Sequence, residues 1–99
     1  MDDIIAERTM LFKSKNGDTT SVNIRIGKPY PVGDLEWACP VRLDGLYNNL
    51  AAQSGIDSLQ SLNLAIRLAN DLLLGLEEDG GTFFFEDGAG PIRVSEIFK

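Results

Sequence analysis

The chain has 99 residues, of which 43% are hydrophobic and 24% are charged, and this balance is typical of one soluble globular domain. Its net charge of -6 disfavours nucleic acid and anionic membranes as partners, because phosphate binding needs clustered basic residues. With one cysteine, Cys39, and no histidine, the chain can form neither an internal disulfide nor a Ser-His or Cys-His catalytic pair.

The first eight residues, MDDIIAER, lack both the basic start and the apolar run of a secretory signal. No stretch approaches the ~18 consecutive apolar residues of a membrane span. We therefore expect a cytoplasmic protein that forms a single α+β domain over residues 1–99.

Two strands are predicted at residues 4–13 and 19–27, because the second alternates strictly between apolar and polar residues. A two-residue Asn-Gly turn would set the apolar side chains of the second strand opposite polar ones. We therefore predict a three-residue loop, residues 15–17, with Gly17 in the left-handed conformation. The resulting register pairs Met10 with Val22, Arg8 with Ile24 and Ala6 with Ile26.

This register turns Arg8 toward the apolar face of the hairpin, where an unpaired guanidinium would be strongly unfavourable. We therefore expect Arg8 to meet a carboxylate or to lie near the rim of the sheet. Two interpretations remain open, a strand-end arginine whose head group reaches solvent and an arginine that binds an anionic group.

Residues 27–34 contain two prolines and two glycines and are predicted as a loop. A third strand is predicted at residues 35–43, because apolar residues alternate along it. They are Leu35, Trp37, Cys39, Val41 and Leu43. Pro40 removes a donor from the ladder, which indicates an edge position or a bulge. Residues 45–55 are expected to form a connection, with a short strand favoured over a helical turn.

A long amphipathic helix at residues 57–78 is the clearest element. Asp57 can cap its first free amides, and Gln60 can reach back to complete a capping box. Apolar residues recur at helical spacing around about half of the circumference. They are Leu59, Leu62, Ile66, Ala69, Leu73 and Leu76, widened by Ala65, Leu68 and Leu72. One small sheet rarely covers so wide an arc, so either the segment around residues 46–50 or a second copy of the chain should cover its flank.

Gly80 and Gly81 are predicted to end the helix. Residues 82–86 follow as a strand whose three phenylalanines put apolar surface on both faces, so the tail or a partner should cover one face. Residues 92–98 close the chain as a strand or a helical turn. We therefore predict the α+β class, with an antiparallel sheet of about four or five strands and one long amphipathic helix packed on one face.

No catalytic, cofactor-binding or metal-ligating residue is predicted. Cys39 shares a face with Trp37 and is expected to be a small buried hydrophobe. General acid catalysis normally needs a carboxyl group whose pKa is raised by burial. The adjacent acids at residues 2–3, 77–79 and 86–87 lie at a terminus or at turns, where we expect solvated side chains instead. Their spacing also differs from that of a calcium loop.

Aromatic residues and arginines near the central loops form a candidate contact set, because both are enriched at binding hot spots. The set consists of Tyr30, Trp37, Tyr47, Arg25 and Arg42, to which Arg8 and Phe84 are added. The simpler alternative places Trp37 in the core, with the tyrosines at its edges.

Several short motifs occur along the first three quarters of the chain: Ala6-Glu7-Arg8-Thr9, Arg25-Ile26-Gly27, Pro29 and Pro31, Trp37, Cys39-Pro40, Gly45-Leu46 and residues 55–62. In this order they resemble a family of short, uncharacterised bacterial proteins, a domain of unknown function. The resemblance implies a bacterial origin and a stand-alone α+β domain, and nothing about a substrate. The tail after Gly80 is expected to lie outside it.

The leading functional hypothesis is a non-enzymatic protein-protein interaction module, an accessory subunit or inhibitor. Its partner would be another protein or a second copy, bound through the helix stripe and residues 83–85. The alternative is a small-ligand-binding protein or minor enzyme, with a pocket between helix and sheet and Arg8, Trp37 and Cys39 around its mouth. No nucleic acid, membrane or cofactor is expected as a partner.

Overall fold

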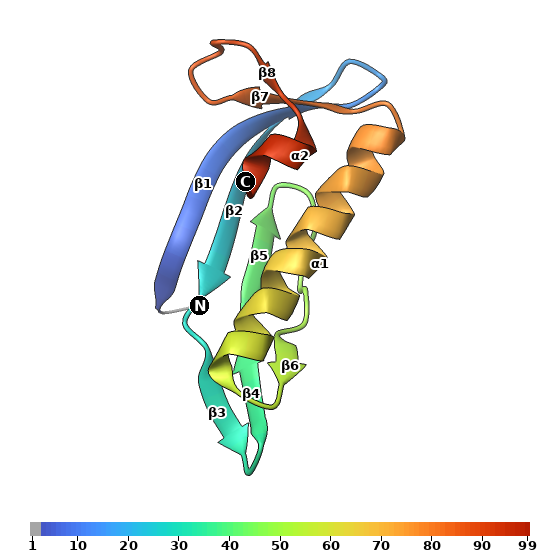
Figure 1. Ribbon diagram of the computed structural model, residues 1–99. Helices are drawn as coiled ribbons and strands as arrows, with labels where there is room; N and C mark the ends of the chain where they lie inside the picture. Colours follow the sequence, from blue (N-terminus) through green and yellow to red (C-terminus); the bar gives the residue numbers. More distant parts are fainter. Residues whose placement is uncertain (1–2) are drawn as a thin grey trace.

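Two antiparallel sheets and a long helix that contacts both make up the computed structural model, which describes residues 3–99 (Figure 1). The strands are β1 (Ile4–Lys13), β2 (Thr19–Gly27), β3 (Tyr30–Gly33), β4 (Glu36–Cys39), β5 (Val41–Asp44), β6 (Gln53–Gly55), β7 (Thr82–Phe85) and β8 (Pro91–Ile92). The helices are α1 (Ser58–Glu78) and α2 (Val94–Ile97). The larger sheet has the order β5-β2-β1-β7-β8 and the smaller has the order β3-β4-β6. The predicted α+β class is confirmed.

The molecule is elongated, with extents of 47 × 24 × 24 Å. The β3–β4 hairpin forms one end, and β7, β8 and the C-terminal end of α1 lie toward the other (Figure 1). Strands β4 and β6 contact α1 at the hairpin end, and the larger sheet continues along the rest of the helix.

The β1–β2 hairpin has the predicted register, with Met10 opposite Val22 and Arg8 opposite Ile24. Gly17 has a φ of +93°, the left-handed conformation that the three-residue loop requires. A slip of one residue would turn the buried side chains of β2 to solvent. The burial of that face therefore determines the register.

The core lies between the inner face of the larger sheet and α1. Val22 and Leu43 are fully buried on the sheet side. On the helix side Ala65, Ala69 and Leu73 are fully buried, at intervals of one helical turn. Two of these three helix residues are alanines, whose small side chains let the helix backbone approach the sheet closely.

Helix α1 starts as predicted, with Asp57 as the capping residue. Its carboxylate oxygen accepts a hydrogen bond from the Gln60 amide at 2.7 Å. The Gln60 side chain reaches back to the amide of Ile56 at 2.8 Å. Two free donors at the start of the helix are thereby satisfied, as in a capping box.

The broad apolar stripe of α1 is covered mainly within the chain. Leu46, Tyr47 and Leu50 of the β5–β6 connection pack against the core, and this connection runs beside the helix (Figure 1). Between the two predicted explanations, the structure therefore supports the one within the chain. Leu59, predicted on the stripe, is exposed instead, because Gly55 packs against the backbone of Ser61 in the first turn.

The predicted third strand is not continuous, which corrects the sequence prediction. It divides at Pro40 into β4 and β5, which belong to different sheets. Pro40 has no N–H for a ladder, and its carbonyl accepts a hydrogen bond from Gly27 at 2.9 Å. Leu35 is not on an apolar face, because it lies in the turn before β4 with a φ of 56°.

The loop prediction for residues 27–34 is also wrong in part, since Tyr30–Gly33 form β3 and pair with β4. Strand β3 is the edge of the smaller sheet, where a proline such as Pro31 is tolerated because its missing donor faces away from the ladder. The weak strand preference of residues 45–55 is confirmed by β6.

The C-terminal tail covers the inner face of the larger sheet near β7. The Phe83 ring is fully buried and lies 4.9 Å from the Phe12 ring, centroid to centroid. Val94 and Ile97 of α2 are buried in the same core. Phe84 projects to the opposite face and is half-buried, because it lies across from Leu11 in β1.

Helix α1 ends in the predicted glycines, in the hydrogen-bond pattern of a Schellman motif. The Gly80 amide donates to the backbone carbonyl of Glu77 at 3.1 Å, and the Gly81 amide donates to the backbone carbonyl of Leu76 at 3.0 Å. Gly80 has a φ of +102°. A side chain at Gly81 would overlap the ring of Phe12, so the chain can leave the helix here only without a Cβ.

We expect Gly81→Ala to lower the free energy of unfolding by about 1–3 kcal/mol, because the new methyl group must displace the Phe12 ring. Urea unfolding followed by circular dichroism measures this. Gly75→Ala is the matched control, since Gly75 lies inside α1 with open space around it, and it should raise stability by about 0.5–1 kcal/mol. Equal stability of the two variants would contradict the close approach.

Candidate functional site

Large apolar side chains are exposed at the end of the molecule formed by the β3–β4 hairpin, the β6–α1 connection and the first turn of α1. Their exposed fractions are 54% for Val32, 82% for Leu35, 60% for Ile56 and 74% for Leu59. The pairing of Trp37 with Gly55 brings them to the same end, because it aligns the start of β4 with the end of β6. We call these four residues the hairpin-end surface.

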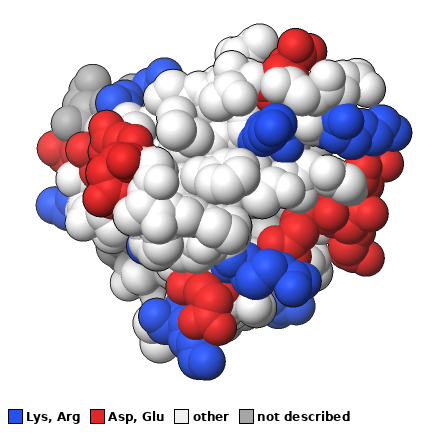
Figure 2. Space-filling model, turned by 90° about the horizontal axis from the view of Figure 1, so that it is seen from above, with Lys and Arg blue, Asp and Glu red and all other residues white. Residues whose placement is uncertain are grey.

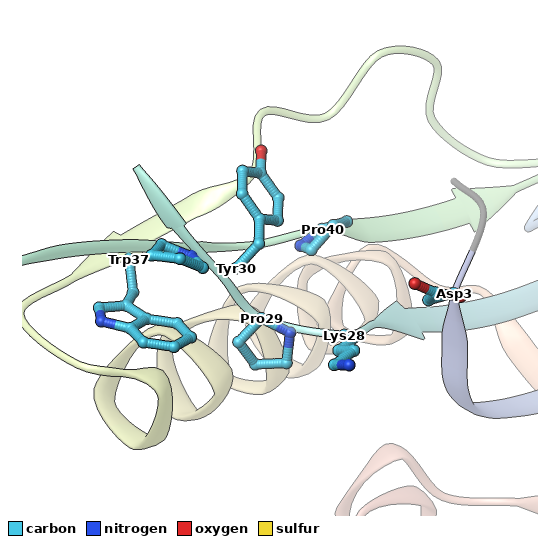
Figure 3. A pocket seen from close by; sticks show the side chains of 7 residues that line it. Asp3, Lys28, Pro29, Tyr30, Trp37 and Pro40 are labelled. Carbon is cyan, nitrogen blue, oxygen red and sulfur yellow. The ribbon is translucent and has the colours of Figure 1, made fainter. Parts of the chain in front are cut away.

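Two of the predicted contact residues, Tyr30 and Trp37, belong to the same hairpin and point to opposite sides of it (Figure 3). Trp37 lies on the helix side, since its partner Gly55 faces the backbone of Ser61 in α1. It is half-buried, and Tyr30 is exposed. The alternative that places Trp37 in the core is wrong, because Trp37 is not part of the core cluster, although Tyr47 packs against that cluster.

Open grooves of about 650 Å³ and 450 Å³ adjoin at Tyr30 and Pro40, which line both. The first also contains Trp37, and the second contains Arg42 and Tyr47. The structure thus brings together four of the seven predicted contact residues, Tyr30, Trp37, Arg42 and Tyr47. Arg8 and Phe84 are not part of this region, because they lie on β1 and β7 in the larger sheet.

The arginines predicted near the central loops are engaged in ion pairs on the outer face of the larger sheet. Arg25 lies 3.3 Å from Glu7 and 3.6 Å from Asp44, and Arg42 lies 3.0 Å from Asp44. At the end opposite the hairpin, Figure 2 shows the Lys and Arg side chains of the described residues in several separate places, with uncharged residues and Asp and Glu between them. Positive charge is therefore dispersed over several parts of the molecule.

Arg8 faces the inner side of the sheet, as the register predicts, and is half-buried. Within residues 3–99 it takes part in no ion pair, so a carboxylate partner is not found in this range. Its guanidinium donates to the carbonyl of Ile97 at 3.2 Å and lies 5.7 Å from the centre of the Phe85 ring. Its side chain also lines a hollow that is open to solvent, in agreement with the predicted position near the rim of the sheet.

Cys39 is fully buried, as predicted, and its Sγ donates to the carbonyl of Gly27 at 3.3 Å. Burial raises the pKa of the thiol, which favours the protonated form that reacts poorly as a nucleophile. The predicted pocket mouth of Arg8, Trp37 and Cys39 is wrong. Arg8 and Trp37 line different hollows, because they belong to different sheets. Cys39 lines neither hollow and is fully buried.

Glu77 corrects another expectation, since its side chain is only 14% exposed and does not lie in a solvated turn. One carboxylate oxygen accepts a hydrogen bond from the Val94 amide at 2.9 Å, and the other lies 3.3 Å from the Arg93 guanidinium. The Val94 amide, assisted by Arg93, holds the pKa of Glu77 below its ordinary value. Sequence reasoning missed this contact because the tail folds back onto the end of α1.

No group of three or more Cys, Asp and Glu side chains within residues 3–99 is arranged to hold a metal ion. Neither helix in this range has both the length and the apolar composition needed to cross a lipid bilayer.

A protein-family model described as a domain of unknown function (DUF6968) matches residues 6–91. The chain belongs to this family. The match extends beyond Gly80 through β7 to the start of β8, so the expectation that the tail lies outside the family is wrong. No curated protein and no solved structure matches the chain.

The Glu77 contact predicts a stability that depends on pH. Since the folded-state pKa of Glu77 lies below its ordinary value of 4.5, its contribution is complete above pH 4.5 and is lost as the pH falls through the lowered pKa. Glu77→Gln should therefore cost about 1 kcal/mol at pH 7 and nothing at a pH where Glu77 is already protonated.

Urea unfolding at a series of pH values from 7 downward measures this difference. Glu78→Gln, at the exposed neighbouring position, is the control and should follow the wild type. A constant difference between Glu77→Gln and the wild type over the whole range would show that the carboxylate charge has no part in the contact.

Proposed function

We propose that this chain is a non-enzymatic protein-protein interaction module, an accessory subunit or inhibitor, which binds its partner through the hairpin-end surface. The observation that carries the proposal is the exposure of four large apolar side chains, each more than half accessible, at one end of the molecule. Burial of such a side chain contributes about 1.5–3 kcal/mol. Apolar groups gathered in this way are typical of a surface that a partner covers.

The edge of strand β3 is poorly suited to pair with a strand of a partner, which favours a contact made by side chains. The pairing of Pro31 with Trp37 requires the ladder bonds to come from Tyr30 and Ala38, because proline has no N–H. The outward positions of this edge are then Pro29 and Pro31, which offer no donors to an added strand. Edges of this kind resist strand addition.

The interface predicted from the sequence, the helix stripe and residues 83–85, is replaced by the hairpin end. Phe83 and the centre of the stripe are buried inside the chain, so they are not accessible to a partner. Two prolines and a tight turn restrict the backbone of the β3–β4 hairpin. The hairpin therefore loses less conformational entropy when it binds a partner.

A protein suits this surface better than nucleic acid, because the net charge is -6 and the arginines lie on different parts of the fold. The proposed protein partner can also be a second copy of the chain. A cytoplasmic location and a bacterial origin are part of the same proposal.

The test is a comparison of variants by affinity purification from the source organism, with each chain tagged and expressed at its native level. The double variant Leu35→Gln, Leu59→Gln should recover at least about tenfold less of a partner that the wild type recovers stoichiometrically, since removal of a buried apolar anchor typically costs more than 1 kcal/mol. Sedimentation velocity of the same proteins reports whether the partner is a second copy.

Leu74→Gln is the matched control, because Leu74 is a partly exposed leucine on α1 far along the helix from Leu59. It should retain the partner. Equal recovery of the partner by the double variant and by the wild type would exclude the hairpin end as the interface. A wild type that is recovered alone and sediments as a monomer would contradict the interaction function itself.

A further inference from the structure

A hollow of about 260 Å³ opens between the inner face of the larger sheet and the two helices. Its apolar wall comes from β2, α1 and the C-terminal segment, and consists of Ile24, Ile26, Ile66, Ile97 and Phe98. Ala6, Glu7 and Arg8 of β1 complete the lining. The hollow shares no residue with the hairpin-end surface, so an inference from it is independent of the proposed function.

Arg8 alone carries positive charge among the described residues that line the hollow. Its neighbour Glu7 is paired with Arg25, 3.3 Å away, as the alternation of the strand directs the two side chains to opposite faces. Arg8 donates one hydrogen bond, to the carbonyl of Ile97. A guanidinium has five N–H donors in a planar fork, so donors remain for a further acceptor.

We propose that this hollow binds a short aliphatic carboxylate, with the carboxylate on Arg8 and the hydrocarbon chain among the isoleucines. A carboxylate matches the planar fork and supplies the negative charge that a half-buried guanidinium lacks within residues 3–99. The apolar wall selects the hydrocarbon chain. The volume is below that of most sites for drug-sized ligands, which favours a short chain.

The test uses the full chain with ¹³C-labelled isoleucine methyl groups, titrated with hexanoate and observed by NMR. We expect saturable shifts at Ile24, Ile26, Ile66 and Ile97, which line the hollow, and none at Ile56 on the hairpin end. Hexan-1-ol has the same chain without the charge and should bind at least about tenfold more weakly. Butanoate should also bind more weakly, by about fourfold for each methylene lost.

Arg8→Gln should weaken hexanoate binding at least about tenfold and leave hexan-1-ol unchanged. Arg67→Gln is the control for the loss of one positive charge, because Arg67 is exposed on α1 and does not line the hollow, and it should bind hexanoate as the wild type does. Ile66→Phe keeps Arg8 but fills the hollow and should abolish binding. It tests the proposal even where Arg8→Gln fails to fold.

Equal affinities for hexanoate and hexan-1-ol would overturn the proposal, since Arg8 would then contribute nothing. Non-saturable shifts, or shifts of the same size at Ile56, would also overturn it by showing non-specific association. Unchanged binding in a folded Arg8→Gln or Ile66→Phe variant would place the ligand elsewhere and would do the same.

Discussion

Burial of one face of β2 against α1 is the interaction on which the remaining structure depends. Val22, Ile24 and Ile26 alternate along the strand, and their burial leaves a single register for the β1–β2 hairpin. That register directs Arg8 inward and Glu7 outward. Strand β7 then pairs with β1, and the Phe12–Phe83 contact joins the C-terminal third of the chain to the same core.

Pro40 determines the shape of the molecule at its other end. Pro40 lacks the N–H that a strand with neighbours on both sides needs, and the chain divides there: β5 stays at the edge of the larger sheet, and β4 pairs with β3 and β6. The smaller sheet extends toward the first turn of α1 and ends in a hairpin whose apolar side chains have too little of the chain around them to be buried. The exposure of Leu35, in the turn of that hairpin, follows from this break.

The arginines differ in whether a carboxylate of the chain neutralises them. Arg25, Arg42 and Arg93 each pair with a carboxylate of this chain, and Glu77 connects α1 to the amide of Val94 in α2. Arg8 has a carbonyl and an aromatic ring as neighbours instead. Most N–H donors of Arg8 therefore have no acceptor within residues 3–99. The inner hollow thus combines an apolar wall with a cation, whereas the exposed side chains of the hairpin-end surface are all apolar.

Local patterns in the sequence were sufficient for the hairpin register, both ends of α1 and the α+β class, because alternation, capping residues and terminal glycines act over a few neighbouring residues. The sequence also indicated that Cys39 is buried. It did not reveal the change of sheet at Pro40, the strand at residues 30–33 or the Glu77 contact. Those features depend on which segments meet in space, and a carboxylate at residue 77 finds the amide of residue 94 only after the core has brought the tail back to the helix.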